Sequence, residues 1–306
     1  MRKLWIDTDA GVDDSTAILL CLACPSVEVV GISCVGGNAS LENVFRNVKR
    51  TINAFGNGKE NIPVYCGESH ALKEPPMHIP EIHGKDGLGD ISSDEFSIPD
   101  QYEVPEKHAV DALIDAVSSY TDLEVLCLGP LTNIAKAISK SDLSSVKHWF
   151  IMGGAEDCVG NTSQWAEFNF AADPEAAHIV FNTIDQRKIT VATWTLSAKH
   201  MISSEEELHF VIGRTDTYLQ RWLNKTWKSI YTFLKDKIVM ADPIAAFVTL
   251  YPEHITSSIK AKMDIVLNGE KRGMSPVVES PDGCTIPKSI DHKKYLEALD
   301  ALMSLK

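Results

Sequence analysis

The sequence predicts an α/β fold: an open, mostly parallel sheet carries helices on both faces, and the C-terminal part is more helical. The main observation is that short apolar or β-branched runs, typical of buried strands, alternate with longer runs of helical pattern. The second observation is that glycines, acids and amides follow directly after several of the expected strands. This rhythm indicates repeated strand–helix–strand units, which place their strands in parallel.

The expected strands are short and apolar. They cover residues 3–7, 27–37, 62–67, 123–128, 146–154 and 188–194. The expected helices between them cover residues 14–24, 40–58 and 173–183, and a further helix follows a tight turn within residues 123–139. Asp14 and Ser15 can cap the first helix, and a glycine closes the second. Helical patterns then dominate residues 205–213, 216–237 and 242–251.

Residues 74–105 contain several prolines and glycines and are expected to form a long loop. Loops of this length are commonly functional or disordered. The chain shows no break in composition, no internal repeat and no linker. We therefore expect a single domain that spans residues 1–306.

Charge and composition exclude several kinds of partner. The chain carries 29 Lys and Arg residues against 42 Asp and Glu residues, a formal net charge of −13. Because nucleic-acid phosphates are bound through clustered basic residues, no nucleic-acid partner is expected. No apolar run approaches the roughly 18 residues of a membrane-spanning helix, so no membrane partner is expected. Seven cysteines without a signal-peptide pattern predict reduced thiols and a cytoplasmic location.

Polar residues and glycines gather after four of the expected strands. In an open parallel sheet, ligands bind beyond the carboxyl ends of the strands, so these residues are expected at one edge. They are Asp7, Asp9, Asp13 and Asp14 after the first strand, Gly36, Gly37 and Asn38 after the second, Gly129, Pro130, Thr132 and Asn133 after residues 123–128, and Gly153 and Gly154 followed by the polar stretch 160–173. Four such strand ends predict a binding site at this edge.

The four aspartates lie within eight residues, in the stretch IDTDAGVDDS. Carboxylates this close repel one another unless a cation lies among them, and oxygen ligands suit Ca²⁺ or Mg²⁺. An EF-hand is excluded: counted from Asp7, the glycine falls at position five rather than six, and Ile18 replaces the glutamate of position twelve. An aspartyl-phosphate phosphatase of the haloacid dehalogenase type would use Asp7 and Asp9, but Gly11 stands where that class has threonine or valine. Helix capping explains one or two aspartates, not four.

Several motifs, in the right order, resemble those of the nucleoside hydrolases, the inosine-uridine-preferring group and its relatives. The opening motif of that family, D-x-D-x-G-x-D-D, is matched by DTDAGVDD at residues 7–14. The resemblance continues through VGGN (35–38), HGKDGLG (83–89), LGPLTNIA (128–135), IMGG (151–154), GNTSQWAEFNFAADPEAA (160–177) and DPIAAF (242–247). It spans most of the chain, and the first and the 160–177 motifs are individually specific.

The resemblance implies that the protein cleaves the N-glycosidic bond of small-molecule ribonucleosides, giving free base and ribose, in nucleoside salvage or catabolism. It also implies a tightly bound Ca²⁺, a Rossmann-like form of the predicted sheet, and assembly as a homodimer or homotetramer.

The family's calcium ligands have counterparts in this chain. Asp9 and Asp14 match the calcium carboxylates at the first strand, and Asp242 matches the third. The backbone carbonyl of Leu128 matches the main-chain ligand. Ribose hydroxyls and a water would complete an oxygen-rich shell, which suits Ca²⁺ better than Mg²⁺. Asp9 also matches the general base that takes a proton from this water, whose pKa the ion lowers.

The family's sugar-binding residues are matched as well. Asp13 and Asn38 match groups that bind ribose hydroxyls, and Asp7 is expected to support the ligands from behind. The rest of the cradle is matched by Asn161, Glu167 and Asn169, with Met152 lining it. Cleavage of a glycosidic bond generates an oxocarbenium-like sugar, whose positive charge nearby carboxylates stabilise.

The leaving-group side departs from the family pattern. In the inosine-uridine-preferring members, a histidine that acts as an acid directly precedes the last calcium aspartate, and here that position is Ala241. Three interpretations stay open. His83 of the HGKDGLG motif helps to protonate the base; Trp227 or Tyr231, which follow Trp222 on one expected helix, stack on a purine; or the protein hydrolyses nucleosides poorly or not at all.

The resulting hypothesis is a calcium-dependent ribonucleoside N-glycosidase in which Asp9 activates water and the leaving-group acid is open. The alternative is a relative that has kept the ribose and calcium site but is catalytically impaired, or that hydrolyses another N-riboside. Purine or pyrimidine preference is not indicated by the sequence.

Overall fold

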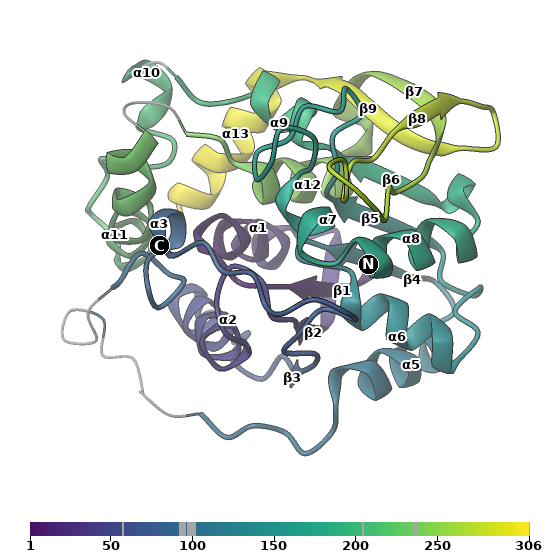
Figure 1. Ribbon diagram of the computed structural model, residues 1–306. Helices are drawn as coiled ribbons and strands as arrows, with labels where there is room; N and C mark the ends of the chain where they lie inside the picture. The colour runs from purple at the N-terminus through teal and green to yellow at the C-terminus, as the bar shows by residue number, and fades with distance from the viewer. Residues whose placement is uncertain (57, 92–95, 97–101, 204, 235–237, 306) are drawn as a thin grey trace.

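A nine-stranded sheet forms the centre of the computed structural model, which describes residues 1–306 except 57, 92–95, 97–101, 204, 235–237 and 306 (Figure 1). The strands are β1 (Arg2–Thr8), β2 (Val27–Cys34), β3 (Val64–Cys66), β4 (Leu123–Cys127), β5 (His148–Met152), β6 (Ile189–Ala192), β7 (Ile255–Met263), β8 (Val277–Glu279) and β9 (Cys284–Ile290).

The helices are α1 (Val12–Ala23), α2 (Leu41–Phe55), α3 (Pro80–His83), α5 (Ala109–Ser119), α6 (Thr132–Lys140), α7 (Phe168–Ala172), α8 (Pro174–Thr183), α9 (Trp194–Lys199), α10 (Glu205–Leu208), α11 (Tyr218–Leu234), α12 (Ala241–Leu250) and α13 (His292–Met303). Two 3₁₀ turns, η1 (Gln186–Lys188) and η2 (Pro252–His254), precede β6 and β7. The ends of the expected helices at residues 57 and 235–237 lie outside the described residues.

The strand order is β3-β2-β1-β4-β5-β6-β9-β7-β8. Neighbouring strands from β3 through β9 run parallel, whereas β7 pairs antiparallel with both β9 and β8. The order reverses at β1, since β2 and β3 extend to one side and β4 to β6 to the other. A crevice opens beyond the carboxyl ends of the strands at such a reversal, and the aspartate-rich turn after β1 lies there. The mostly parallel α/β sheet expected from the sequence is confirmed.

Each face of the sheet is covered by its own set of helices. Alternate residues of one strand point to opposite faces, so Leu4 and Ile6 pack with α1, α2, α12 and α13, whereas Trp5 packs with α5, α6 and α8. The two apolar layers hold the strand ends in fixed register. Figure 1 shows α11 and α3 side by side at one edge of the molecule and β7 and β8 at the opposite edge.

Several elements were not assigned from the sequence. The C-terminal part carries α10 to α12 as expected, and it also contains the helix α13 and adds β7, β8 and β9 to the sheet, none of which was predicted. Most side chains of β7 are exposed serines, threonines and lysines, so its apolar signal is weak. The helix α5 was also missed. The expected loop at residues 74–105 contains α3, and its residues 92–95 and 97–101 lie outside the described part.

One continuous sheet runs from residue 2 to residue 290, which suits the predicted single domain. Among the described residues, no helix has the length and apolar character needed to cross a bilayer.

A half-buried histidine at the start of β5 predicts how stability depends on pH. The ring of His148 packs on Phe150, and its Nε2 lies 2.8 Å from Thr190 Oγ1. Burial lowers the pKa of His148 to about 4. The unfolded chain binds a proton near pH 6.5, so the folding stability from neutral His148 is present above that pH and is lost as the pH falls towards 4.

Urea unfolding measures the free energy of unfolding at pH 7.5 and at pH 5. His148 should account for about 1 kcal/mol of the decrease between these pH values, a figure that allows for the partial exposure of the ring to solvent. The loss should be correspondingly smaller in His148→Gln. The exposed His209, changed to Gln, serves as the control and should keep the wild-type pH dependence. Equal pH dependence in all three proteins would contradict the prediction.

Candidate active site

The turn between β1 and α1 gathers the aspartates of the first motif. Ala10 adopts a positive φ of 35°, an uncommon conformation for a residue other than glycine, and so directs the chain sharply from the strand into the helix. Asp14 accepts hydrogen bonds from Thr8 Oγ1 at 2.5 Å, from the Gly11 N–H at 2.8 Å and from Asn38 Nδ2 at 3.0 Å. These donors fix one carboxylate at the N-terminus of α1, where the helix dipole favours negative charge.

Three carboxylates from two helices converge at this point. Oxygen atoms of Asp13, Asp14 and Asp242 all lie within 4.8 Å of one another, with Asp242 in the first turn of α12. The helices α1 and α12 pack together, which brings residues more than 200 positions apart into one cluster. Two unit charges at this separation repel by about 3–4 kcal/mol at an effective dielectric constant of about 20. The cluster therefore has the geometry of a divalent-cation site.

Asp9 adjoins this cluster at the end of β1 and is fully buried. Its Oδ2 accepts the Asn38 N–H at 2.7 Å, and its Oδ1 has no hydrogen-bond partner among the described residues. A buried acceptor without a donor is costly unless a ligand pairs with it. Gly37 and Gly129 leave the space for this side chain: a Cβ on Gly37 would lie 2.1 Å from Asp9 Oδ2, and one on Gly129 would lie 3.0 Å from Asp9 Cβ.

The pKa values of these carboxyl groups reflect burial and their mutual repulsion. Burial, followed by repulsion from Asp14, raises the pKa of Asp9 well above its ordinary value. The same causes, with further repulsion from Asp13 and Asp9, raise the pKa of Asp242 strongly. Burial and Asp14 also raise the pKa of Asp13 to about 7. A divalent cation would reverse these shifts, because it favours the charged form of each ligand. The donor set thus fits a metal ion.

The proposed main-chain ligand lies at the end of β4. The carbonyl of Leu128 accepts a hydrogen bond from Asn169 Nδ2 at 2.7 Å, and the second lone pair of that oxygen is available to another ligand. Asn169 Nδ2 also lies 3.2 Å from both the carbonyl oxygen and the Sδ of Met152. One amide therefore ties together the ends of β4 and β5.

Glu167 precedes α7 and caps it. Its two carboxylate oxygens accept N–H groups of Gly154 at 2.8 Å, Asn169 at 2.8 Å and Phe170 at 3.2 Å. Burial raises the pKa of Glu167 to about 7, and these N–H groups oppose the rise. Asn161 lies on an exposed turn, and its Oδ1 accepts the Phe168 N–H at 2.9 Å. The structure therefore brings Met152, Glu167 and Asn169 together inside the fold, with Asn161 on an exposed turn joined to the start of α7.

His83 reaches the aspartate turn from α3. Its Nδ1 accepts the Val12 N–H at 3.1 Å and lies 4.0 Å from Asp13 Oδ1. An Nδ1 that accepts a hydrogen bond carries no proton, so the neutral ring keeps its proton on Nε2. Burial lowers the pKa of His83 to about 4, and Asp14 opposes this shift. In this environment His83 is a neutral hydrogen-bond donor at neutral pH.

The aromatic residues proposed to contact a base occupy different environments. Trp227 is fully buried, and its Nε1–H donates to Thr16 Oγ1 of α1 at 2.9 Å. It exposes no ring face for stacking in this structure. Tyr231 is half-buried and lines a surface hollow beside α11. Ala241 is the first residue of α12 and places a methyl group beside Asp242.

Comparison with known proteins places this site in a family. The model of the inosine-uridine preferring nucleoside hydrolases matches residues 4–297. The chain belongs to the nucleoside hydrolase family. The suspected resemblance is thereby confirmed, and the protein is a ribonucleoside hydrolase, an enzyme that cleaves N-glycosidic bonds.

Individual relatives of this nucleoside hydrolase agree with the family match. The chain is 34% identical over 261 residues to probable uridine nucleosidase 2 of Oryza sativa subsp. japonica, covering 83% of this chain and 76% of that protein. It is 30% identical over 278 residues to the inosine-uridine preferring nucleoside hydrolase of Crithidia fasciculata, covering 88% and 85%. A solved inosine-guanosine nucleoside hydrolase shares the fold, with a TM-score of 0.90 at 24% identity and 100% of both chains covered.

Asp7 was expected to support the ligands, but the hydrogen-bonding roles of Ser33, Asn133 and Asn47 were not assigned from the sequence. Buried Asp7 accepts hydrogen bonds from Ser33 Oγ and from Asn133 Nδ2, the latter at 2.8 Å. Burial raises the pKa of Asp7 to about 7, and these two donors oppose the rise. Asn47 Nδ2 donates to the carbonyls of Ala10 at 3.2 Å and Asp86 at 2.9 Å, joining the aspartate turn to the loop after α3. Polar residues inside apolar helical faces, such as Asn47 in α2, were the available signal.

The burial of Trp227 predicts a structural rather than a substrate-binding role. Trp227→Phe removes the hydrogen bond to Thr16 and part of the ring, so the free energy of unfolding should fall by about 1–3 kcal/mol. Urea unfolding measures this loss, and kcat/KM for inosine and uridine should stay within threefold of wild type. Unchanged stability combined with a large loss of activity on inosine alone would support base stacking instead.

Proposed function

We propose that this hydrolase cleaves ribonucleosides to free base and ribose with a Ca²⁺ ion held by Asp9, Asp14, Asp242 and the carbonyl of Leu128. The observation that supports it best is Asp9, a buried carboxylate with an unpartnered Oδ1 beside a cluster of three further carboxylates. A set made only of oxygen donors, with room for substrate hydroxyls and water, suits Ca²⁺ better than the smaller and stricter Mg²⁺.

The chemistry near the ion divides between metal and protein. When bound, Ca²⁺ orients a water and makes its deprotonation accessible near neutral pH. Asp9 is the general base that receives the water proton, and Oδ1 is its oxygen to which no donor from the described part of the chain binds. Asn38 holds the other oxygen of Asp9 through its N–H, which fixes the direction in which Oδ1 points.

The remaining site residues orient the sugar. Asp13, which is partly exposed beside His83, and Asn38 bind ribose hydroxyls. Glu167, Asn161 and Asn169 complete the cradle, with Met152 lining it. A sugar held at several points reacts as an oriented substrate, which is worth several kcal/mol of activation free energy. Negative charge nearby stabilises the oxocarbenium-like sugar that forms as the base departs.

The leaving base receives no proton from residue 241, because the side chain of Ala241 is a methyl group. His83 assists it by donating a hydrogen bond from Nε2–H, and Tyr231 is the aromatic residue for contact with the base.

The second candidate function follows from Ala241. A site without an acid at position 241 favours N-ribosides whose base leaves well without protonation, and it hydrolyses ordinary nucleosides poorly. Assembly as a homodimer or homotetramer and a cytoplasmic location complete the proposal.

Asp9→Asn tests the general base. The change keeps the shape of the side chain but removes its basicity, so ribose release from inosine or uridine should fall by on the order of 10²–10⁴-fold. The same change removes one buried negative charge, and the ion-free variant should melt no lower than wild type. Asp122→Asn, on the exposed turn before β4, is the matched control and should retain full activity. Retained activity in Asp9→Asn would exclude the assigned role.

Removal of the ion tests the calcium assignment. Dialysis against a chelator should abolish ribose release, and Ca²⁺ should restore more activity than Mg²⁺, because Ca²⁺ accepts more oxygen ligands in a less strict geometry. Isothermal titration calorimetry should show that one Ca²⁺ binds per chain. Asp242→Asn should weaken this binding. Full activity after complete removal of divalent ions would refute the proposal.

His83→Ala tests assistance to the base. Loss of the Nε2–H donor should slow cleavage of inosine about tenfold or more and change cleavage of nitrophenyl riboside little, because that leaving group needs no assistance. The exposed His70, changed to Ala, is the control and should leave both rates unchanged. Equal losses on both substrates would assign His83 to the shape of the site rather than to the leaving group.

A further inference from the structure

A second charged feature of the hydrolase lies on α11, outside the carboxylate cluster. The helix carries Arg221, Lys225 and Lys228 and no aspartate or glutamate, although the chain as a whole has a net charge of −13. Residues three or four positions apart share one side of a helix, so the three cations form a like-charged stripe without a compensating acid on the same helix. A stripe of this kind attracts anions.

Lys225 and Lys228 border two surface hollows. The hollow on the Gly89 side has a volume of about 430 Å³, and Phe233 also lines it. The volume lies within the range of small-molecule sites. Phe233 is 53% exposed, so its ring is accessible to a ligand in this hollow. Two ammonium groups and an exposed aromatic ring therefore share one hollow.

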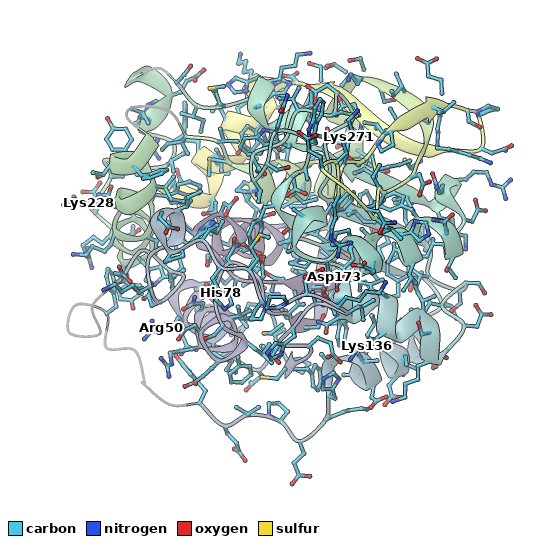
Figure 2. All side chains as sticks on the ribbon, viewed as in Figure 1. Arg50, His78, Lys136, Asp173, Lys228 and Lys271 are labelled. Carbon is cyan, nitrogen blue, oxygen red and sulfur yellow. The ribbon has the colours of Figure 1, made fainter. Side chains whose placement is uncertain are left out.

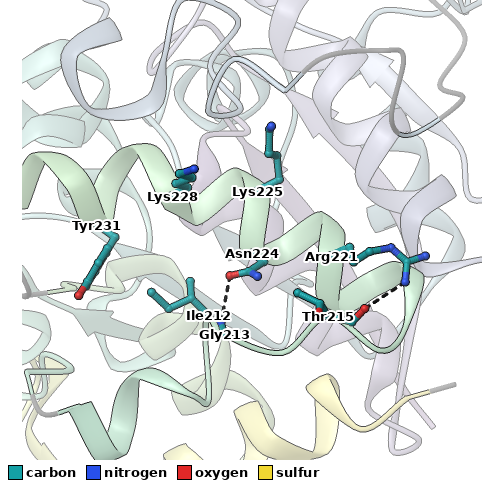
Figure 3. A pocket seen from close by; sticks show the side chains of 8 residues that line it. All are labelled: Ile212, Gly213, Thr215, Arg221, Asn224, Lys225, Lys228 and Tyr231. Carbon is teal, nitrogen blue, oxygen red and sulfur yellow. Dashed lines mark hydrogen bonds between the residues drawn. The ribbon is translucent and has the colours of Figure 1, made fainter.

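In the neighbouring hollow, of about 480 Å³, polar side chains form hydrogen bonds within the protein. Arg221 Nη1 donates to the carbonyl of Thr215 at 3.1 Å, and Asn224 Oδ1 accepts the Gly213 N–H at 2.9 Å. These contacts hold the loop that precedes α11. Figure 3 shows Lys225 and Lys228 on the side of the helix away from Gly213 and Thr215. The lysines are thus directed away from this loop.

We propose that the hollow bounded by Gly89, Lys225, Lys228 and Phe233 is a second binding site, which takes nucleoside monophosphates. Each lysine ammonium offers three N–H donors, so it can bind a phosphate oxygen in addition to any protein partner. The nucleobase stacks on Phe233, since every base has a flat face that an aromatic ring can cover. The lysines and the aromatic ring together therefore suit a small molecule that carries both an anionic group and a flat ring.

A phosphorylated nucleoside suits this place better than the carboxylate cluster, where buried aspartates repel a phosphate. Figure 2 shows Lys228 at the outer edge of the molecule and His78 nearer its centre; His78 Nδ1 lies 2.7 Å from the Gly37 carbonyl beside Asp9. The two sites are nevertheless connected. The Gly89 N–H donates to the His83 carbonyl at 2.7 Å, so a ligand in the hollow contacts the turn that carries His83.

Titration calorimetry of uridine monophosphate into the calcium-loaded protein tests the site. The double variant Lys225→Gln with Lys228→Gln should bind at least tenfold more weakly, and glutamine keeps the helix because its helix propensity is close to that of lysine. The matched control removes the same charge from the exposed face of β7, as Lys260→Gln with Lys262→Gln, and should bind within twofold of wild type. Higher salt should weaken binding to the wild type.

Two further measurements identify the ligand class and the location. Phe233→Leu should weaken the binding of uridine monophosphate severalfold and leave the binding of inorganic phosphate unchanged. Saturating ribose should not displace the nucleotide from the wild-type protein. No binding at low salt would overturn the proposal. The proposal would also be overturned if ribose displaced the nucleotide and the lysine double variant still bound it, because the nucleotide would then occupy the carboxylate site. Inorganic phosphate that binds as tightly as the nucleotide would overturn the assigned ligand class.

Discussion

The structure depends on the burial of like-charged carboxylates at the carboxyl end of β1. Asp9, Asp14 and Asp242 are almost fully buried, and with Asp13 they form a cluster that is unfavourable by itself. Hydrogen bonds from Thr8, Asn38 and the N-terminus of α1 offset part of the cost. The raised pKa values of Asp9, Asp13 and Asp242 show that repulsion remains, and a bound cation would relieve it. The same buried carboxylates therefore account both for the proposed function of the site and for its local instability.

The surroundings of the cluster are arranged to keep these carboxylates close. The glycines after β2 and β4 lack the Cβ atoms that would collide with Asp9, and Ala10 accepts an uncommon backbone conformation to start α1 at the right place. Behind them, Asn47 joins the aspartate turn to the loop after α3, while Asn169 joins the ends of β4 and β5. Amide side chains that bridge backbone segments give the site its rigidity, since each fixes two chain segments at once.

The side that we propose faces the leaving base is built differently. It has an alanine before Asp242 and a neutral, buried histidine that contacts the N-terminus of α1. Its outer boundary is α11, whose inner face packs through Trp227 and whose outer side is positively charged. The sugar side is thus rich in negative charge and closely bonded, whereas the base side offers shape and few polar groups. This contrast agrees with the proposed function, in which many polar contacts hold the ribose and few contact the base.

The sequence by itself determined the parallel α/β sheet, the edge where polar residues gather and the membership of the family, because strand–helix alternation and short motifs are local properties of the chain. It did not indicate β7, whose exposed polar face hides its strand pattern, or the roles of Asn47 and Asn133, whose partners are distant in sequence. The family resemblance already implied that Asp14 and Asp242 lie together. Only the tertiary structure decided that Asp13 joins them, that Trp227 is buried against α1 and that His83 binds Val12 through Nδ1. These outcomes depend on how α1, α3, α11 and α12 pack together, and burial and hydrogen-bond direction are properties of that packing rather than of any single segment.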